Sequence, residues 1–235
     1  MEPIRVFVGY DREQALASAV FAHSVIRRAS RPVTVQPIVL EQLKPFFDRP
    51  RDPLQSTAFA FSRFLVPFLS GYEGWSIFAD GDMICRADIA ELFDLRDGRC
   101  AVQVVRRERH EITADGRKFL DRPQTAYARK NWSSVMLFNN ARCLRLTPEY
   151  VATARGLELH QFGWVRDDAD IGALPAEWNH LVGVDAPRPS PKIVHYTLGM
   201  PYFKGLRECE WASDWRAERD AMLTYERLLD DEIAA

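Results

Sequence analysis

The chain has 235 residues, of which 47% are hydrophobic, and this is enough to form one sizeable core. Its net charge of -2 gives no strong field that would attract nucleic acid or an anionic membrane, so neither is expected as a partner. The first residues, MEPIRVFVGY, lack the pattern of a secretory signal, and no run approaches the roughly 18 apolar residues of a membrane-spanning helix. We therefore expect a cytoplasmic protein without a transmembrane segment.

The first forty residues read as a strand, a helix and a second strand. Residues 4–11 predict a buried strand that ends in a glycine-containing turn, and residues 33–40 predict a strand whose proline indicates an edge or a bulge. Residues 12–30 between them predict an amphipathic helix, with Ala15, Ala19, Ala22 and Ile26 near helical spacing. This order is typical of a parallel α/β layer.

The middle of the chain continues the alternation of helices and strands. Residues 57–70 are apolar on most faces and predict a helix that Pro67 kinks or ends. Asp88 and Thr147 are predicted to cap two further helices, and Pro148 suits a first helical position. Further strands are predicted at residues 74–80, 100–105, 132–139 and 192–197.

The end of the chain predicts one more helix. From Ala212 onward, Trp215, Met222, Leu223 and Leu229 can lie on one face. We interpret residues 1–211 as one α/β domain and residues 212–235 as a helical extension packed on or beside it. The scattered Cys85, Cys100, Cys143 and Cys209 form no CxxC pair and are expected to be buried thiols rather than disulfides or zinc ligands.

Two carboxylates, Asp80 and Asp82, follow a predicted buried strand directly, with only Gly81 between them. In a parallel α/β sheet, ligands bind at the carboxyl ends of strands, and residues i and i+2 of an extended stretch point the same way. Two like charges this close are costly unless a cation joins them, and hard oxygen ligands suit Mg²⁺ or Mn²⁺. Gly81 would let a ligand approach the backbone. The alternative is a surface turn, because Asp-Gly is also a turn dipeptide.

Four ordered blocks of the chain resemble a known family. The blocks are VFVGYDREQALASAVFAHSVIRR, FSRFLVPFL, FADGDMIC and IVHYTLGMPYF, and LPAEWNHLV adds to the set. They are similar to the GT-A glycosyltransferases, specifically to the retaining branch that contains glycogenin and the bacterial lipopolysaccharide galactosyl- and glucosyltransferases (glycosyltransferase family 8). The resemblance implies a GT-A fold, which is α/β and Rossmann-like with a mostly parallel central sheet and helices on both faces.

The resemblance also implies a donor, a metal and a set of binding residues. The donor is a nucleotide sugar, usually UDP-linked, and the metal is Mn²⁺ (or Mg²⁺) held by Asp80, Asp82 and His195. A nitrogen ligand beside two oxygens favours Mn²⁺ over Mg²⁺. For His195 alone, the alternative is a satisfied histidine at a strand end. Other candidates for contact with the donor are Val8, Gly9, Tyr10, Asp11, Arg63, Asp80, Gly81, Gly199 and Lys204.

Each of these donor candidates has a structural alternative. Tyr10 can stack on the base, whereas Asp11 can also be a helix cap. Arg63 lies in an apolar segment, where it can pair with Asp80 or the donor, or extend to the surface. Lys204 departs from the family pattern, because it follows Gly199 by five residues where the family lysine lies closer.

The sequence leaves the reacting residues and the acceptor open. Gln161 can stabilise the charge at the anomeric carbon and Asp167 or Asp168 can act as a nucleophile, although RDDAD reads equally as a solvated loop. Ser133 or Ser134 is expected to line the sugar pocket. A saccharide, a lipid-linked glycan, a protein side chain and a small metabolite all remain open as the acceptor. Residues that either contact it or serve the fold are Trp164, Trp178 and Asn179.

Three other functions fit parts of the sequence. A phosphatase of the haloacid dehalogenase type uses an Asp-x-Asp after a strand, but normally after the first strand of the fold. A sugar nucleotidyltransferase would need a Gly-rich, arginine-containing phosphate loop, which VGYDREQA is not. A non-catalytic nucleotide-binding domain would have no need for Asp80, Asp82 and His195 together.

Overall fold

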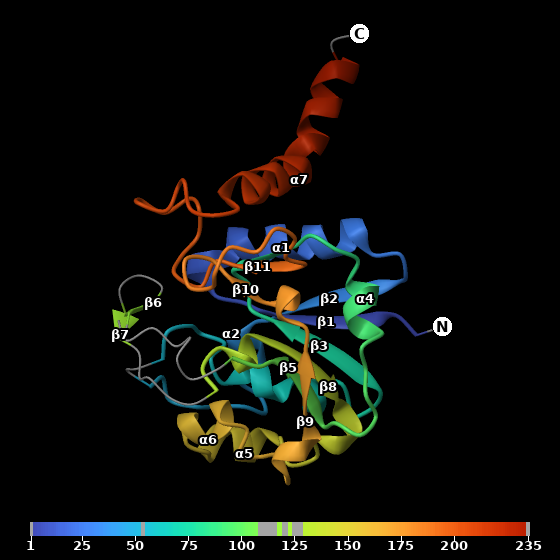
Figure 1. Ribbon diagram of the computed structural model, residues 1–235, viewed down its shortest axis with the longest axis vertical. Helices are drawn as coiled ribbons and strands as arrows, with labels where there is room; N and C mark the ends of the chain where they lie inside the picture. The colour runs from blue at the N-terminus through green and yellow to red at the C-terminus, as the bar shows by residue number, and fades with distance from the viewer. Residues whose placement is uncertain (1, 53–54, 108–116, 119–121, 124–128, 234–235) are drawn as a thin grey trace.

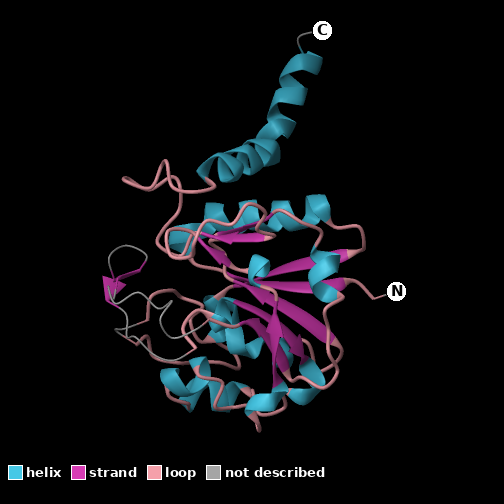
Figure 2. Cartoon of the chain, in the orientation of Figure 1, coloured by secondary structure: helices cyan, strands magenta, loops and turns pink. Residues whose placement is uncertain are grey.

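A six-stranded sheet forms the centre of the molecule, with the strand order β2-β1-β3-β8-β5-β9 (Figures 1 and 2). The structure is a computed structural model that describes residues 2–52, 55–107, 117–118, 122–123 and 129–233; for residues 117–118, 122–123 and 224–233 it describes only the backbone. β1 pairs in parallel with β2 and β3, and β5 pairs in parallel with β9, whereas β8 runs antiparallel to both its neighbours. The strands are β1 (Ile4–Gly9), β2 (Val33–Ile38), β3 (Trp75–Ala79), β5 (Val102–Val105), β8 (Val135–Asn139) and β9 (Ile171–Leu174).

A second sheet brings late residues of the chain beside the end of β3. Its order is β10-β11-β4, formed by β10 (His180–Leu181), β11 (Ile193–His195) and β4 (Met83–Cys85). β4 begins only four residues after β3 ends, so the two sheets meet at Asp80–Asp82. A two-stranded pair, β6 (Arg117–Lys118) and β7 (Arg122–Pro123), lies apart from both sheets in Figure 1.

Helices cover both faces of the central sheet (Figure 1). Along β8, Val135 and Leu137 face one hydrophobic cluster, whereas Met136 and Phe138 face the other. This alternation is expected for a strand whose side chains point to opposite faces, both of them buried. The first cluster includes side chains of α1 (Ala15–Arg28) and α4 (Ile89–Phe93), and the second includes side chains of α2 (Leu40–Leu43), α3 (Val66–Leu69), α5 (Pro148–Thr153) and α6 (Gly156–His160).

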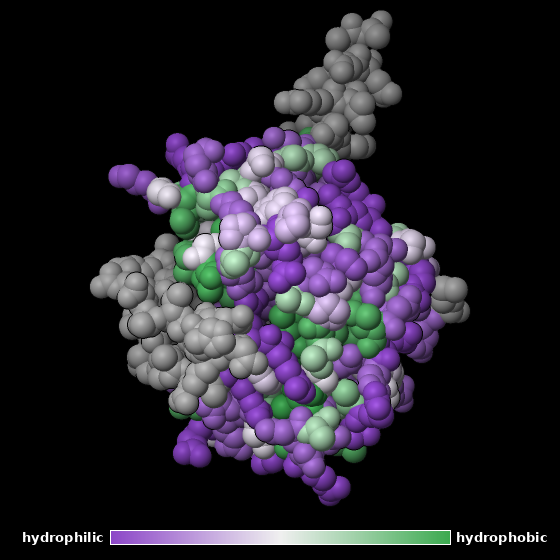
Figure 3. Space-filling model, in the orientation of Figure 1, coloured by the Kyte–Doolittle hydropathy of each residue, from purple (hydrophilic) through white to green (hydrophobic). Residues whose placement is uncertain are grey.

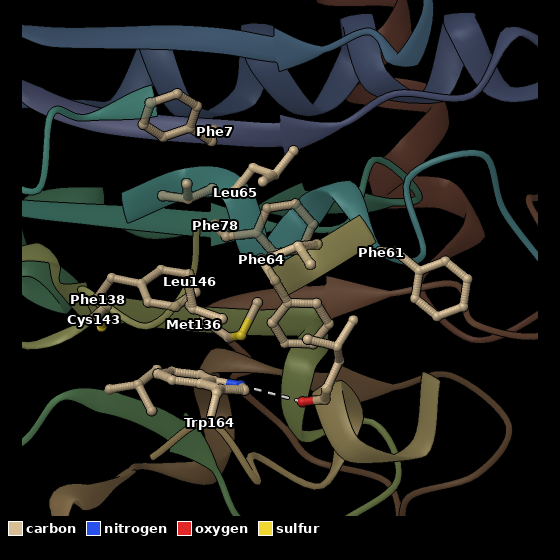
Figure 4. Close-up of a cluster of buried hydrophobic side chains, with 14 of the residues drawn as sticks. Phe7, Phe61, Phe64, Leu65, Phe78, Met136, Phe138, Cys143, Leu146 and Trp164 are labelled. Carbon is tan, nitrogen blue, oxygen red and sulfur yellow. Dashed lines mark hydrogen bonds between the residues drawn. The ribbon is translucent and has the colours of Figure 1, made fainter. Parts of the chain in front are cut away.

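Aromatic side chains dominate the second cluster (Figure 4). Phe64, Phe78 and Phe138 are fully buried, and each such side chain contributes roughly 1.5–3 kcal/mol relative to an exposed one. Trp164 closes the cluster, and its Nε1 donates to the carbonyl of Leu159 at 3.3 Å. Trp178 is equally buried in the opposite cluster. Both tryptophans therefore serve the core, which was one of the two roles expected for them.

The C-terminal helix α7 (Ala212–Ile233) begins where the sequence indicated an extension. Its first half lies over α1, and its far end rises away from the rest of the chain (Figure 1). Trp215 is fully buried and Met222 is half-buried, but Leu223 is 48% exposed, so the predicted apolar face is only partly used. Leu229 is outside the residues whose side chains are described.

Several local predictions are confirmed, and two are wrong. β2 is an edge strand, and Asp88 and Thr147 cap α4 and α5 through their side chains. Residues 57–70 do not form one helix that Pro67 kinks or ends; Pro67 lies in the first turn of α3, which follows a 3₁₀ turn over Ser62–Leu65. The face of α1 that was expected from Ala15, Ala19, Ala22 and Ile26 is largely exposed, and the buried face consists of Ala17, Ser18, Val20, Phe21, Ser24 and Val25.

The four cysteines are placed as the sequence predicted. Cys85, Cys100 and Cys143 are buried, Cys209 is half-buried, and all four are free thiols. Burial raises the pKa of Cys85 to about 12, which keeps this thiol protonated and unreactive. The face shown in Figure 3 is largely hydrophilic, with hydrophobic residues in small separate patches. Within the described residues, none of the helices combines the length and apolar composition that crossing a bilayer would require.

Candidate active site

Asp80, Asp82 and His195 lie together although more than a hundred residues separate the acids from the histidine. The antiparallel register of β11 and β4 pairs His195 with Met83, and Tyr196 N donates to the carbonyl of Asp82 at 2.9 Å. His195 Nε2 is 3.2 Å from Asp82 Oδ1 and 3.8 Å from Asp80 Oδ2. One ligand atom from each of the three residues lies within 4.8 Å of the others. The arrangement that the sequence required is therefore present.

The donor set fits a divalent cation. Asp80 and Asp82 are 9% and 7% exposed, and His195 is 1% exposed, so three polar groups converge in a nearly closed place. Two carboxylates and one imidazole are a typical ligand set for Mn²⁺, and such a set leaves further coordination positions for phosphate oxygens. Within the described part of the chain, this is the one cluster of this kind that the structure contains.

Arg63 reaches the site from the turn before α3. Its Nη1 is 2.8 Å from Asp80 Oδ1 and also donates to the carbonyl of Ser133 at 2.9 Å. The guanidinium lies 5.1 Å from the ring centroids of both Phe59 and Phe78, and the residue is only 6% exposed. Of the roles considered for Arg63, the structure shows the ion pair with Asp80. One oxygen of this carboxylate thus faces Arg63 while the other faces His195.

The second ring nitrogen of His195 contacts Asn179. Asn179 is fully buried directly before β10, and its Oδ1 is 3.1 Å from His195 Nδ1. The sequence had suggested that Asn179 contacts an acceptor or its own turn, and this contact was missed. Only the pairing of β10 with β11 reveals it, because nothing in the spacing of the two residues indicates that they meet.

Gly81 lies where the chain packs closely. A Cβ atom at this position would lie 2.3 Å from Ser18 Oγ and 2.4 Å from the carbonyl oxygen of Gly9. The space on this side of the glycine is therefore filled by α1 and the end of β1, which is a packing reason for glycine that the sequence did not indicate. Contact of Gly81 with a donor stays a prediction.

A cavity of about 910 Å³ opens in front of the three clustered residues. Its walls come from the segment after β2, from the turn before β8 and from α6. The lining is mixed in charge and rich in hydrogen-bonding groups, as a site for a sugar and a diphosphate would need. It includes Asp52, Thr57, Arg63, Asp80, Asp82, Arg129, Asn131, Ser133, Ser134, Arg155, His160, Gln161 and His195.

The turn before β8 contributes both predicted serines to the cavity. Ser133 Oγ is 2.9 Å from His160 Nδ1, and Ser134 Oγ donates to the carbonyl of Asn131 at 2.6 Å. His160 is held against the ring of Phe64, with centroids 5.2 Å apart and an interplanar angle of 76°. The sequence did not indicate Arg129 or Arg155 as cavity residues, because neither is part of a recognisable motif.

Gln161 and the aspartates of RDDAD occupy different environments. Gln161 lines the cavity, and its backbone carbonyl accepts a hydrogen bond from Arg129 at 2.7 Å. Asp167 is exposed and caps a 3₁₀ turn by accepting from Ala169 N, and Asp168 is exposed and pairs with Arg129. Neither aspartate lines the cavity. Their placement favours the solvated-loop alternative over a nucleophile.

The turn after β1 is largely occupied by the fold. Val8 is buried in the core, and a Cβ atom on Gly9 would lie 2.4 Å from the ring of Phe59. Asp11 accepts hydrogen bonds from Glu13 N at 3.0 Å and from Ala58 N at 2.9 Å, and so ties this turn to the segment after β2. Tyr10 is half-exposed. Contact of these residues with a nucleotide stays a prediction.

The loop after β11 packs against α1 and the start of α7. Gly199 has φ of 133°, a conformation that glycine adopts readily, and a Cβ atom there would lie 2.7 Å from Leu206. Burial, together with the charge of Asp82, raises the pKa of Tyr202 to about 12, and this ring packs on Trp215 with centroids 5.3 Å apart. Lys204 is exposed and does not line the cavity.

A characterised plant protein is similar over almost the whole chain. Protein CDI of Arabidopsis thaliana is 42% identical over 229 residues, which cover 93% of this chain and 87% of that protein. This chain belongs to the protein CDI family. No family model matches it.

Solved structures similar to this CDI-family chain are glycosyltransferases. The bifunctional glycosyltransferase WbbM gives a TM-score of 0.63 at 16% identity; the match covers 92% of this chain and 49% of WbbM, so the chain spans about half of that protein. The galactosyltransferase LgtC gives 0.58 at 13% identity, covering 93% of this chain and 96% of LgtC. GlyE of Streptococcus pneumoniae TIGR4 gives 0.61 at 16% identity, covering 94% of this chain and 63% of GlyE. The CDI-family chain has the GT-A glycosyltransferase fold, as the sequence resemblance predicted.

Proposed function

We propose that this chain is a metal-dependent glycosyltransferase. It takes a sugar from a nucleotide-sugar donor, a UDP-sugar, and transfers it to an acceptor hydroxyl with retention at the anomeric carbon. The observation that carries the proposal is the cluster of Asp80, Asp82 and His195, which opens onto a cavity within a GT-A fold. LgtC shares this fold, and its structure is of a galactosyltransferase in complex with donor and acceptor sugar analogs. Because one fold can host several activities, the argument depends on the cluster and not on the fold alone.

The three clustered residues are the proposed holders of Mn²⁺. When bound, such an ion acts as a Lewis acid that neutralises charge on a departing diphosphate. Arg63 holds Asp80 Oδ1 at 2.8 Å, and this contact fixes the plane of the carboxylate so that Oδ2 faces His195. The same Nη1 also donates to the carbonyl of Ser133 at 2.9 Å. These contacts keep Asp80 in place before any ligand arrives, which is what preorganisation requires.

The lining of the cavity also provides groups suited to a sugar. Ser133, His160 and Gln161 line it and bear hydroxyl, imidazole and amide groups, which can orient sugar hydroxyls. We assign Gln161 the role of stabilising positive charge at the anomeric carbon through its amide oxygen. The exposed positions of Asp167 and Asp168 do not support a carboxylate nucleophile from that loop.

The phosphatase alternative is not favoured by the structure. The strand before Asp80 is β3, and a complete β1-α1-β2 unit precedes it. Asp80 is paired with Arg63, and Asp82 lies beside His195. A nucleophilic aspartate on the first strand, as that class normally has, is not part of this arrangement.

Thermal unfolding with added ligands tests the proposal. We expect UDP with Mn²⁺ to raise the melting temperature, because a ligand at 100 times its dissociation constant stabilises by about 2.7 kcal/mol. Inorganic phosphate with Mg²⁺ is expected to have no comparable effect. A panel of nucleotide sugars then identifies the donor through slow Mn²⁺-dependent hydrolysis. Stabilisation by phosphate with Mg²⁺ alone, or hydrolysis of no nucleotide sugar, would contradict the proposal.

A further inference from the structure

A hydrogen-bonded chain leads from the turn before β8 to the imidazole of His195. Ser134 Oγ donates to the carbonyl of Asn131 at 2.6 Å, and Asn179 Nδ2 lies 2.8 Å from the same hydroxyl oxygen. Asn179 Oδ1 then lies 3.1 Å from His195 Nδ1. Asn179 is 0% exposed and His195 is 1% exposed, so bulk water does not compete for these contacts.

The donors and acceptors along this series of hydrogen bonds determine which ring nitrogen of His195 carries the proton. A serine hydroxyl has one proton, and that of Ser134 points to a carbonyl, which can only accept. The oxygen of Ser134 is therefore an acceptor toward Asn179, so the NH₂ group of the amide faces it. The amide oxygen of Asn179 consequently faces His195, and because this oxygen only accepts, Nδ1 of the imidazole must carry a proton.

The other ring nitrogen of His195 faces the two acids. Nε2 is 3.2 Å from Asp82 Oδ1 and 3.8 Å from Asp80 Oδ2. An imidazole that keeps its proton on Nδ1 offers the lone pair of Nε2 to a cation in this direction. Ligating histidines commonly donate their second N–H to a carboxylate or carbonyl, which fixes both the tautomer and the ring orientation.

The backbone of Asn179 is also held in place. Arg107 donates to its carbonyl oxygen and forms an ion pair with Asp185, and Asp185 Oδ2 accepts from Leu181 N at 2.8 Å. The ladder of β10 and β11 pairs Leu181 with His195. Asn179 is thus anchored directly before β10, the strand that pairs with β11 and its His195.

We propose that Asn179 is a positioning residue for the cation site: through the Asn131–Ser134–Asn179 chain it keeps the proton of His195 on Nδ1 and directs Nε2 toward Asp80 and Asp82. The inference rests on the proposed function only in taking a divalent cation as the ligand of this cluster. Asn179 touches neither donor nor acceptor in this role. Its effect is transmitted through the orientation of His195.

Mn²⁺ binding to the whole chain, without any nucleotide, tests the role of Asn179. Electron paramagnetic resonance of the free ion gives the dissociation constant. Asn179→Leu removes the acceptor at nearly constant volume, and we expect it to weaken Mn²⁺ binding by about 10–100-fold, the usual effect of losing such a support. Asn179→Asp retains an oxygen that faces Nδ1 and is expected to bind Mn²⁺ nearly as well as the wild type.

Asn140 offers a matched control. It is also 0% exposed, and its Nδ2 donates to the carbonyl of Glu73 at 2.9 Å and contacts Ser76 Oγ at 3.0 Å, with no contact to the cluster. Asn140→Leu removes a buried amide of the same kind, so it should lower stability without changing the Mn²⁺ dissociation constant. A merely structural role for Asn179 would make the two variants behave alike.

The proton on His195 can be observed directly. Long-range ¹H–¹⁵N spectra of the Cd²⁺-loaded chain distinguish the two ring nitrogens, and His195→Gln identifies the resonances among the five histidines. We expect the proton on Nδ1 in the wild type. A proton on Nε2 with a bare Nδ1 would overturn the inference.

The outcomes separate this inference from the proposed function. If Asn179→Leu binds Mn²⁺ as tightly as the wild type, or if the wild type binds no Mn²⁺, the positioning role is overturned. If Mn²⁺ binding follows the predicted order but no nucleotide sugar is hydrolysed, the positioning role stands and the proposed function fails.

Discussion

Two acidic segments of this chain look alike in sequence but differ in burial and in surroundings once folded. Asp80 and Asp82 are nearly buried, lie at the junction of two sheets and converge with His195. Asp167 and Asp168 are exposed on a loop, where one caps a turn and the other pairs with Arg129. Keeping carboxylates buried is costly unless something compensates their charge. The first pair therefore indicates a function, whereas solvent is enough to accommodate the second.

The largest difference between the two segments is expected in activity. Asp82→Asn removes a charged ligand without changing the size of the side chain, and we expect Mn²⁺-dependent hydrolysis of the nucleotide sugar to fall by about 100-fold or more. Asp168→Asn should leave the rate nearly unchanged, because this residue lies outside the cavity. Both rates are measured with the donor identified by the hydrolysis panel. Hydrolysis that survives in Asp82→Asn would place the reaction elsewhere.

The second difference is expected in the free energy of unfolding. Arg63→Gln leaves Asp80 buried without its counter-charge, so urea denaturation without metal should show a loss of about 3–5 kcal/mol. Arg142→Gln breaks the 2.7 Å pair with Asp170, in which the arginine side chain is 41% exposed, and should cost at most about 1 kcal/mol. Equal losses from the two substitutions would show that Asp80 is not compensated by Arg63.

The glycine between the acids offers a third test of this close packing. Gly81→Ala would bring a Cβ atom within 2.3 Å of Ser18 Oγ and 2.4 Å of the carbonyl oxygen of Gly9, and we expect a loss of about 1–3 kcal/mol. Gly98 has nothing within 4 Å of the same added atom, so Gly98→Ala is the control and should be nearly neutral. Thermal melting compares the two. A neutral Gly81→Ala would mean that α1 yields easily at this point.

The smallest expected effect concerns a third kind of carboxylate, on α7. Glu218 is 3% exposed and meets Arg28 at 2.6 Å and His23 at 2.7 Å, both on α1. Burial alone would raise the pKa of Glu218. The hydrogen bonds from Arg28 and His23 and the charges of Arg28 and Arg27 outweigh this effect, so the pKa lies below the ordinary value of 4.5. A lowered pKa in the folded state adds stability above pH 4.5, and this stability is lost as the pH falls through the folded value.

The pH dependence is measured as the urea midpoint between about pH 6 and pH 3, where a carboxyl group of ordinary pKa titrates. Glu218→Gln should flatten the part of the curve that Glu218 contributes. Asp220→Asn, on the same helix and exposed, should leave the curve unchanged. A curve that Glu218→Gln does not alter would mean that the ion pairs with α1 contribute nothing to the docking of α7.

The cluster was predictable from two different signals. The position of Asp80 and Asp82 directly after an apolar strand indicated a ligand site, and only the family resemblance added His195 to the two acids. The caps at Asp88 and Thr147 were predictable because they depend on contacts within a few residues. Contacts within a few residues therefore account for the correctly predicted caps, whereas the fold family and the place of His195 came from the resemblance.

The failures arise where side chains far apart in the chain decide the outcome. The buried face of α1 was missed because Ala15 and Ala19 are small and apolar but lie on the exposed side, while Ser18 and Ser24 are buried. Ser24 is buried because its Oγ accepts from Cys85 N at 2.9 Å, a contact across 61 residues. The roles of Gly81 and Asn179 were missed for the same reason, because each depends on a neighbour that only the folded chain brings close.

β8 is antiparallel to both of its neighbours, so its N-terminal end, and not its C-terminal end, lies beside Asp80. Ala79 pairs with Val135, and Asp80 N donates to the carbonyl of Ser134 at 3.0 Å. One wall of the cavity is thus formed by the turn that precedes β8, whereas Asp80 and Asp82 follow the end of β3. The turn before β8 can be lengthened or replaced in relatives without a change in the pairing of any strand. Under the proposed function, acceptor choice can therefore diverge there while Asp80 and Asp82 stay fixed.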